Sequence, residues 1–232
     1  MAEVLKNAGS HRILAIMIGL SGESPLQLIE VAGRTAYQSR EKINEESATK
    51  FVEMLRNRGH ESVIEHSSMT VEFNNVSRGL THELVRHRLM AITQESTRYV
   101  DESNFQVVIP PHKDPDEHLV ELILPGGGLL TVSFSDWMEL NEQMYRGLRK
   151  IGWVAEDARQ VLPTGIKSQI VITTNFREWR HIFKMRCDRS AHWEIRGVML
   201  SLLRDIQQRI PVIFDDFVIS EDGQSATLRK TP

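Results

Sequence analysis

The chain has 232 residues, of which 41% are hydrophobic and 25% are charged, and its formal net charge is −3. This length and composition are typical of one globular domain with a sizeable core, and they exclude collagen-like and disordered chains. The negative charge argues against a protein that coats nucleic acid, because such binding needs a surplus of Lys and Arg. The single cysteine, Cys187, excludes an intramolecular disulfide and a Cys-rich metal site, and it fits a reducing compartment.

The first expected element is a buried strand over residues 13–20. A secretory signal could also contain such an apolar run, but no A-x-A-like cleavage site follows it. No stretch approaches the ~20 apolar residues of a membrane span. We therefore expect a soluble, cytoplasmic protein with no membrane partner.

Two helices with clear end signals follow. Ser24 as N-cap and Gln27 as the closing residue of a capping box predict the start of a helix that runs to about residue 37. Apolar residues at helical spacing between residues 48 and 55 predict the second helix, and Gly59 provides a left-handed stop. Alternation over residues 69–73 then predicts a half-buried strand, followed by a third helix over about residues 77–88.

The second half of the chain begins with residues 101–133, whose Pro and Gly content and poor periodicity predict an irregular excursion. The later elements are expected to be a helix over 134–151, a short helix from about 158 to 163, a strand over 169–174, a helix capped by Asn175 and a terminal helix that stops before Pro211. The pattern predicts the α+β class, with one mixed domain over residues 1–232 in which helices flank an antiparallel-type sheet.

The densest local cluster of basic residues is Arg86-His87-Arg88, with Ser96 and Arg98 following shortly after it. Arginine forks match phosphate geometry, so this cluster predicts an anion site. A solvated basic turn with surface ion pairs to nearby glutamates explains the same residues equally well, because such pairs are common and weak. The spacing alone leaves both interpretations open.

A second cluster comprises Asn175, Arg177, His181 and Arg186, opposite an apolar stripe on one predicted helix. Arg177 and His181 share a face because they are four residues apart. The helix start at Asn175 would present backbone N–H groups to an anion. Without further information, an N-cap with a solvated polar face is the more economical interpretation.

Two zinc-site patterns fail on spacing. His82-Glu83 opens like H-E-x-x-H, but Arg86 stands where the second histidine is required. Glu65-His66 could end H-x-x-E-H, but Ser62 stands three residues before Glu65. No metal site is expected, and the chain also lacks the P-loop and the G-x-G-x-x-G fingerprint.

Three stretches resemble the flavin-dependent thymidylate synthase family in order and spacing. They are HESVIEH from His60, RHRLMAITQESTRYV from Arg86, and ARQVLPTGIKSQIVITTNFREWRHIFKMR from Ala158 with AHWEIR after it. The resemblance covers about residues 34–196. It implies a homotetramer with FAD held where subunits meet, and it departs from the family pattern at Ala36, Thr93 and His192.

The resemblance also implies roles for individual residues. The expected FAD contacts are Ser62, Glu65, His87, Arg88, Leu89, Thr93, Asn175, Arg177 and His181. The expected dUMP contacts are Glu83, Arg86, Gln94, Glu95, Ser96, Thr97, Arg98, Arg159 and Arg186. Among them, Arg186 is the expected catalytic residue.

The implied reaction transfers the methylene carbon of methylenetetrahydrofolate to C5 of dUMP and reduces it with flavin hydride, which NADPH replaces. Ser96 is expected to bind phosphate, because a serine nucleophile needs an adjacent base that the sequence does not place. Cys187 is expected to pack in the core. Two alternatives remain open: a hydroxymethylase that uses water in place of hydride, and a non-catalytic nucleotide- or RNA-binding module.

Overall fold

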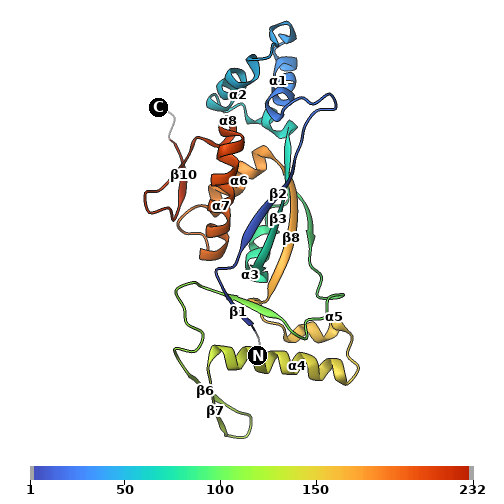
Figure 1. Cartoon of the computed structure of the whole chain (residues 1–232), viewed down its shortest axis with the longest axis vertical. Coiled ribbons are helices and arrows are strands. Elements are labelled where there is room, and N and C mark those ends of the chain that lie inside the picture. Colours follow the sequence, from blue (N-terminus) through green and yellow to red (C-terminus); the bar gives the residue numbers. More distant parts are fainter. Residues whose placement is uncertain (1–2, 230–232) are drawn as a thin grey trace. The chain divides into compact units, whose positions relative to one another are not determined.

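The structure is a computed structural model that describes residues 3–229, and its chain forms two compact units. Among the described residues, unit 1 comprises 3–9, 74–83 and 94–170, whereas unit 2 comprises 10–73, 84–93 and 171–229. Each unit is assembled from three separate stretches of sequence. The elements of both are labelled in Figure 1.

Unit 2 contains most of the helices. Its helices are α1 (Pro25–Ala36), α2 (Ser47–Asn57), α6 (Phe176–Arg186), α7 (Trp193–Arg209) and α8 (Pro211–Phe214), with the 3-10 turns η1 (Arg40–Lys42) and η2 (Glu61–His66). The antiparallel pair β9 (Phe217–Ile219) and β10 (Ala226–Leu228) follows α8. In this unit α1 packs against α2 and η2, and α7 packs against α6 and β2.

A four-stranded sheet has the order β2-β3-β8-β4. Its strands are β2 (Ser10–Ile16), β3 (Ser68–Ser77), β8 (Lys167–Asn175) and β4 (Ala91–Gln94). The long strands β3 and β8 contribute residues to both units. The predicted strands over 69–73 and 169–174 are confirmed, and each is longer than its alternating segment.

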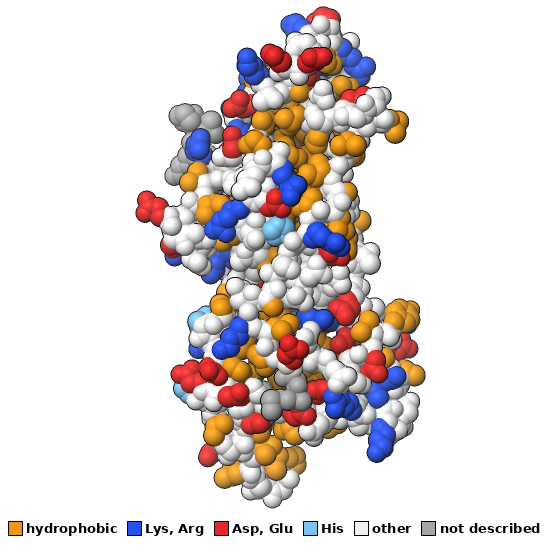
Figure 2. Space-filling view, in the orientation of Figure 1, with side chains coloured by type: hydrophobic (Ala, Val, Ile, Leu, Met, Phe, Trp, Pro, Cys, Tyr) orange, Lys and Arg blue, Asp and Glu red, His pale blue; other side chains and the backbone are white. Residues whose placement is uncertain are grey.

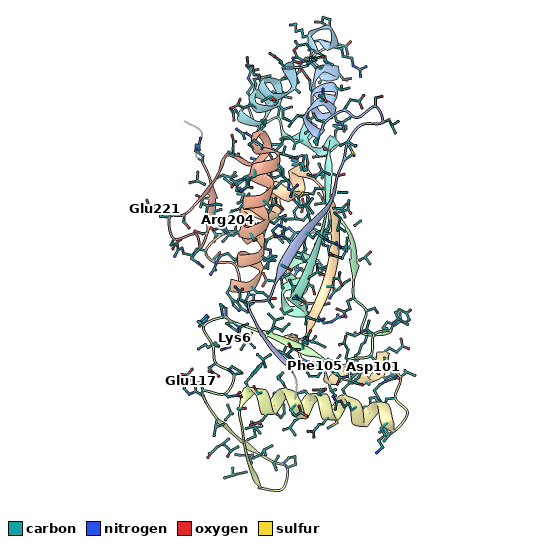
Figure 3. All side chains as sticks on the ribbon, viewed as in Figure 1. Lys6, Asp101, Phe105, Glu117, Arg204 and Glu221 are labelled. Atoms are coloured by element: carbon teal, nitrogen blue, oxygen red, sulfur yellow. The ribbon has the colours of Figure 1, made fainter. Side chains whose placement is uncertain are left out.

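Unit 1 is built on α4 (Phe134–Lys150) and small strand pairs. Its elements are β1 (Glu3–Lys6), β5 (Gln106–Ile109), β6 (Val120–Ile123), β7 (Leu129–Val132), α5 (Ala155–Ala158) and η3 (Arg159–Val161), together with most of α3 (Arg78–Leu84). The pair β1 and β5 is parallel, and β6 and β7 form an antiparallel hairpin. Phe105, labelled in Figure 3, packs with Val107, Ile109 and Met138 in the core of this unit.

Residues 101–133 are therefore more regular than their composition indicated. Three short strands lie in this range, and β5 is held in an extended conformation because it pairs with β1, about a hundred residues earlier in the sequence. The hairpin has apolar residues on its surface, including Ile123 and Leu129, and orange side chains mark its end in Figure 2. Alternation is weak there because neither face of the hairpin is fully buried.

The helix signals in unit 2 are confirmed. The Ser24 side chain accepts a hydrogen bond from the Gln27 backbone N–H, and the Gln27 side chain accepts one from the Ser24 N–H. Gly59, just beyond α2, has a φ of 72°. On α6 the stripe of Phe176, Trp179 and Phe183 is completely buried.

Two expectations about local structure were wrong. The buried strand expected first, over residues 13–20, is instead β2 (Ser10–Ile16), which follows β1 and is an edge strand of its sheet with no buried residue; its Leu14 is 43% exposed. The third helix ends at Leu84, four residues before Arg88, where the His87 N–H donates to the Leu84 carbonyl. The chain has to turn there because residues 91–94 continue as β4.

The mixed α and β class with antiparallel strand pairs is confirmed, with one parallel pair added. Across residues 3–229 we find no helix that combines the length and the apolar character needed to cross a bilayer. The C-terminal pair is tied to the helical layer, since Arg204 of α7 donates to the Gly223 carbonyl in the β9–β10 turn, near Glu221 (Figure 3).

Candidate active site

Two cavities lie side by side in unit 2 and share three lining residues, Leu89, Glu178 and His181. We call them the arginine cavity, of about 780 Å³, and the acidic–basic cavity, of about 750 Å³. The arginine cavity is lined by Arg86, His87, Arg88, Leu89, Glu178, His181, Met185 and Arg186. The acidic–basic cavity is lined by Glu61, Glu65, Leu89, Asn175, Arg177, Glu178, Arg180, His181, Lys184 and Leu228.

The turn between α3 and β4 supplies one wall of the arginine cavity. Because α3 ends at Leu84, residues 86–89 lie outside the helix and form an irregular turn that begins with the bond from the His87 N–H to the Leu84 carbonyl. The Thr174 hydroxyl of β8 donates to the Leu89 carbonyl at 2.5 Å, which fixes the turn to the sheet. Leu89 itself is 72% exposed and stands between the two cavities.

The opposite wall is α6, whose sequence places its polar residues away from the buried aromatic stripe. Asn175 caps the helix by accepting a hydrogen bond from the Glu178 N–H at 2.9 Å. Glu178, His181, Met185 and Arg186 then follow on the side that faces the turn. The two basic clusters of the sequence therefore meet at one cavity.

Their direct link is a hydrogen bond from Nε of Arg186 to Nε2 of His87, at 3.0 Å. Nδ1 of the same ring lies 3.6 Å from Oε1 of Glu178. Burial, Arg186 and His181 lower the pKa of His87 to about 4, so the ring is neutral at pH 7. Burial raises the pKa of Glu178, and the nearby His181 partly offsets this effect.

His87, Glu178 and His181 also place potential metal-ligand atoms within 4.8 Å of one another. A metal bound through Nδ1 of His87 would need the ring proton on Nε2, where it would meet the donor N–H of Arg186. The observed hydrogen bond instead assigns the proton to Nδ1, which faces Glu178. This side of the cavity thus fits a protonated Nδ1 facing a carboxylate better than a cation.

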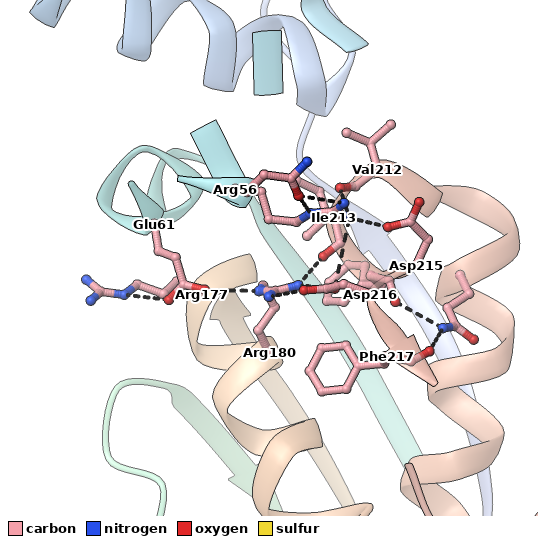
Figure 4. Close-up of polar contacts among 12 residues, drawn as sticks. Arg56, Glu61, Arg177, Arg180, Val212, Ile213, Asp215, Asp216 and Phe217 are labelled. Atoms are coloured by element: carbon pink, nitrogen blue, oxygen red, sulfur yellow. Dashed lines mark hydrogen bonds and ion pairs between the residues drawn. The ribbon is translucent and has the colours of Figure 1, made fainter. Parts of the chain in front are cut away.

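The acidic–basic cavity is bordered by an ion-pair network drawn in Figure 4. Arg177 pairs with Glu65, and Arg180 forms two hydrogen bonds of 2.7 Å to the carboxylate of Asp216. Glu61 contacts both arginines, at 3.8 Å for Arg177 and 3.4 Å for Arg180. The carboxylate of Glu61 in η2 thereby connects the exposed Arg177 of the cavity to the buried anchor Arg180.

Arg180 is that anchor, with a side chain only 6% exposed. Its burial lowers the pKa of the guanidinium, but the hydrogen bonds and charge of Asp216 and Glu61 outweigh burial, and the net pKa is raised. Arg56 of α2 adds a second link, because it pairs with Asp215 and donates to the Val212 carbonyl at 2.6 Å. The network ties α2, η2, α6 and the α8–β9 turn together.

Unit 1 contains the remaining members of the expected nucleotide set. These are Glu83, Gln94, Glu95, Ser96, Thr97, Arg98 and Arg159. Arg159 donates to the Thr97 hydroxyl at 3.5 Å, and the Ser96 hydroxyl accepts from the Arg98 N–H at 3.3 Å. Arg98 pairs with Glu156 at 2.7 Å, rather than with the glutamates adjacent in sequence.

The 95–98 segment is supported by the partly buried Arg78, which lies beside the buried Glu102 and was not predicted from the sequence. Arg78, at the start of α3, donates to the Glu95 carbonyl at 2.7 Å. Burial lowers the pKa of Arg78, and burial together with the charge of Glu95 raises the pKa of the neighbouring Glu102 to about 7. The sequence contained no sign of this group, because Arg78 and Glu102 fall outside both basic clusters.

The expected FAD residues are only partly brought together. His87, Arg88 and Leu89 line the arginine cavity, and Glu65, Asn175 and Arg177 line its neighbour. Ser62 and Thr93 lie in the same unit but are not among the residues that line either cavity. Six further lining residues were not anticipated: Glu61, Glu178, Arg180, Lys184, Met185 and Leu228. The first five of these lie inside the recognised motifs, so their position was a signal, whereas Leu228 had none.

Comparisons with known proteins agree on one family. The sequence model described as "Thymidylate synthase complementing protein" matches residues 20–212. The flavin-dependent thymidylate synthase of Mycolicibacterium vanbaalenii is 37% identical over 205 residues, which cover 84% of this chain and 82% of that protein. The protein of the same name from Mycobacterium avium is 33% identical over 211 residues, covering 88% and 84%.

A solved structure shares the fold. The crystal structure of the UMP/dUMP methylase PolB from Streptomyces cacaoi, bound with 5-Br dUMP, matches with a TM-score of 0.69 at 23% identity and covers 92% of this chain and 95% of that one. The match of the fold extends over both units. The family model and the curated relatives show that the chain belongs to the flavin-dependent thymidylate synthase family.

Proposed function

We propose that the protein converts dUMP to dTMP, with methylenetetrahydrofolate as the carbon donor and FAD as the redox cofactor. The family membership supports the reaction, since its named relatives are thymidylate synthases. In this reaction the methylene carbon forms a bond to C5 of the pyrimidine, and a hydride then reduces it to methyl. Tetrahydrofolate and oxidised flavin are the other products.

One observation carries the proposal: three arginines converge on a single cavity in a chain of net negative charge. Arg86, Arg88 and Arg186 come from two distant segments and all line the arginine cavity. Such a site attracts an anion, and arginine forks donate bidentately to phosphate or to paired carbonyl oxygens. A pyrimidine nucleotide offers both groups, and we assign Arg86 and Arg186 to it, whereas we assign Arg88 to the flavin.

The adjoining cavity fits the cofactor. It presents the donors Asn175, Arg177 and Lys184 beside the acceptors Glu61 and Glu65, a mixture that suits a ligand with phosphates, hydroxyls and ring N–H groups. Because the two cavities share Leu89, Glu178 and His181, ligands in them would touch the same side chains. A bound flavin supplies the hydride, and NADPH is the proposed source of its reducing equivalents.

The residues of this chain bind and orient the reactants. Arg186 is the residue we assign to the nucleotide at the reacting ring, and His87 orients its guanidinium through the bond to Nε. Orientation of this kind converts an encounter into a near-attack geometry and accounts for much of the rate gain in reactions of two bound substrates. We also assign Gln94, Ser96, Arg98 and Arg159 of unit 1 to nucleotide binding, as the family resemblance implies.

We further propose a homotetramer in which neighbouring subunits complete each site. Support comes from apolar side chains on the surface of unit 2. Examples are Leu14 of the edge strand β2 and Ile18, which follows that strand and is 64% exposed. A cytoplasmic setting suits the buried free thiol of Cys187. Folate would then enter as a third ligand of the assembled site.

The test is an anaerobic assay of the purified protein with dUMP, methylenetetrahydrofolate, FAD and NADPH, in which the product is identified by mass. Thymidylate that requires all four additions is the expected result. A hydroxymethylated nucleotide would replace the methylase by a hydroxymethylase. A colourless protein that binds dUMP and forms no product would instead support a nucleotide-binding module.

A further inference from the structure

We propose that Glu178 is a positioning residue which, through His87, sets the orientation of the Arg186 guanidinium in the arginine cavity. The inference rests on the proposed function in one respect only, namely the identity of the nucleotide that Arg186 receives. The structural part concerns three side chains and holds for any anionic ligand. Glu178 is a buried acid whose role neither the basic clusters nor the motifs explain.

The first step is the position of Glu178. Glu178 is 8% exposed and lies in the first turn of α6. Its backbone N–H donates a hydrogen bond to the side chain of Asn175, the helix cap, at 2.9 Å. The carboxylate reaches 3.6 Å from Nδ1 of His87. A buried carboxylate is costly unless another group uses its charge or its lone pairs. His87 is the group at hand.

The second step is the proton on the imidazole ring. A neutral histidine has one N–H donor and one acceptor nitrogen. Nε2 accepts from Arg186 at 3.0 Å, so the ring proton resides on Nδ1 and points toward Glu178. Glu178 therefore stabilises the tautomer whose Nε2 lone pair is available to Arg186.

The third step is the arginine. The guanidinium is a rigid planar fork, so a bond that fixes Nε also fixes the plane and the directions of its other donors. With the opposite tautomer, two N–H groups would face each other and the fork would have to turn away. The His87 ring is further held by an edge contact with His181, whose centroid lies 5.6 Å away.

Glu178→Ala, Glu178→Gln and the matched control Glu221→Gln test the proposal in the flavin-loaded protein. Glu221 is an exposed acid of unit 2 in the β9–β10 turn and lines neither cavity. We expect Glu178→Ala to weaken dUMP binding, measured by calorimetry, by about 10-fold or more, the scale of losing an interaction with a charged group. Glu178→Gln should keep most of the affinity, because the amide oxygen still presents a lone pair to the Nδ1–H, and Glu221→Gln should match the wild type.

A double-mutant cycle separates positioning from a direct contact with the ligand. In a His87→Ala background, Glu178→Ala should add less than about a 2-fold change, because its route to Arg186 is already absent. Full additivity of the two losses would overturn the proposal. Unchanged affinity in Glu178→Ala alone would overturn it as well.

A second readout needs no ligand. Nitrogen NMR of histidine-labelled protein should show the Nδ1–H tautomer for His87 in the wild type and a shift toward the other tautomer in Glu178→Ala. An Nε2–H tautomer in the wild type would contradict the chain of bonds, and so would stoichiometric Zn²⁺ bound through Glu178. If wild-type protein does not bind dUMP, the proposed substrate fails, while this NMR result still decides the role of Glu178.

Discussion

Nε of Arg186 donates a hydrogen bond to Nε2 of His87 over 3.0 Å, although the two residues are 99 positions apart in the chain. The bond connects the turn after α3 with the last turn of α6. It makes the Arg-His-Arg motif and the C-terminal motif parts of one cavity wall. The nucleotide arginine is thus oriented by a residue of the motif expected to contact the flavin.

We expect Arg186→Ala to retain bound flavin and to lower kcat/KM for thymidylate formation by about 100-fold or more, the scale seen when an oriented donor to a reacting group is removed. Steady-state kinetics with dUMP as the varied substrate measures the effect. The matched control is Arg189→Ala, which removes an exposed arginine paired with Asp222. Near-normal turnover of Arg186→Ala would refute the assignment.

Arg88→Ala should instead release flavin. Arg88 lines the arginine cavity as an exposed cation, so its loss removes a partner for an anionic or carbonyl-rich ligand without disturbing the core. The absorbance of flavin after gel filtration gives the occupancy. Arg58→Ala, at the exposed end of α2, is the control. An Arg88→Ala protein that stays fully yellow would count against a flavin role for this residue.

Asp216→Ala should destabilise the protein strongly. The change leaves the nearly buried guanidinium of Arg180 without its two 2.7 Å hydrogen bonds, and loss of one partner of a buried pair costs about 3 to 5 kcal/mol. The urea midpoint should fall accordingly. Asp222→Asn breaks only an exposed pair and should leave the midpoint unchanged. Equal midpoints in the two variants would show that the network does not hold unit 2 together.

Protonation of His87 should make the folding stability of the protein depend on pH. Its pKa is about 4 when folded, below the usual value of 6.5, so the unfolded chain binds the extra proton first as pH falls. Folding stability therefore drops between about pH 6.5 and 4. His87→Gln should flatten this part of the curve of thermal midpoint against pH.

Glu102 should act in the opposite sense. Its folded pKa of about 7 exceeds the ordinary value of 4.5, so the folded state holds the proton longer and its stabilising contribution is lost as pH rises from about 4.5 to 7. Glu102→Gln should remove this loss and so make the fall of stability toward acid pH steeper. The two variants would thus change the slope of the profile in opposite directions within the same window, and slope changes of the same sign would contradict the separate assignments.

Cys187 should be inert to thiol reagents in the native protein. The residue is fully buried, so reagents cannot reach its sulfur. Burial also raises the pKa of the thiol to about 12, so the reactive thiolate is not populated at neutral pH. Reaction with a coloured disulfide reagent should require denaturant. Rapid labelling of the folded protein would show that the C-terminal end of α6 opens readily.

Local signals predicted much of the fold. Ser24 with Gln27 marked the start of α1, and the stripe of Phe176, Trp179 and Phe183 identified the buried face of α6, because caps and periodicity depend on neighbours in sequence. The β6–β7 hairpin and the exposure of β2 were not predictable in this way. Pairing partners and edge positions depend on residues far along the chain.

The site shows the same division. Arg86 and Arg186 were recognised from their motifs, and the structure brings both to one cavity. Glu178 was passed over because its residue type and its place after the Asn175 cap indicate only a polar helix face. Its relation to His87 arises from the early end of α3 at Leu84, whereas the sequence predicted a helix that continues to about residue 88.

The last of the strands within residues 3–229 also borders the acidic–basic cavity, through Leu228 of β10. A purification tag or fusion partner joined directly beyond this strand would begin next to the proposed cofactor site. Such a handle would compete with the flavin or restrict its entry, and the protein would lose colour for a reason unrelated to any engineered substitution. Protein for all cofactor measurements should therefore carry its tag at the opposite end.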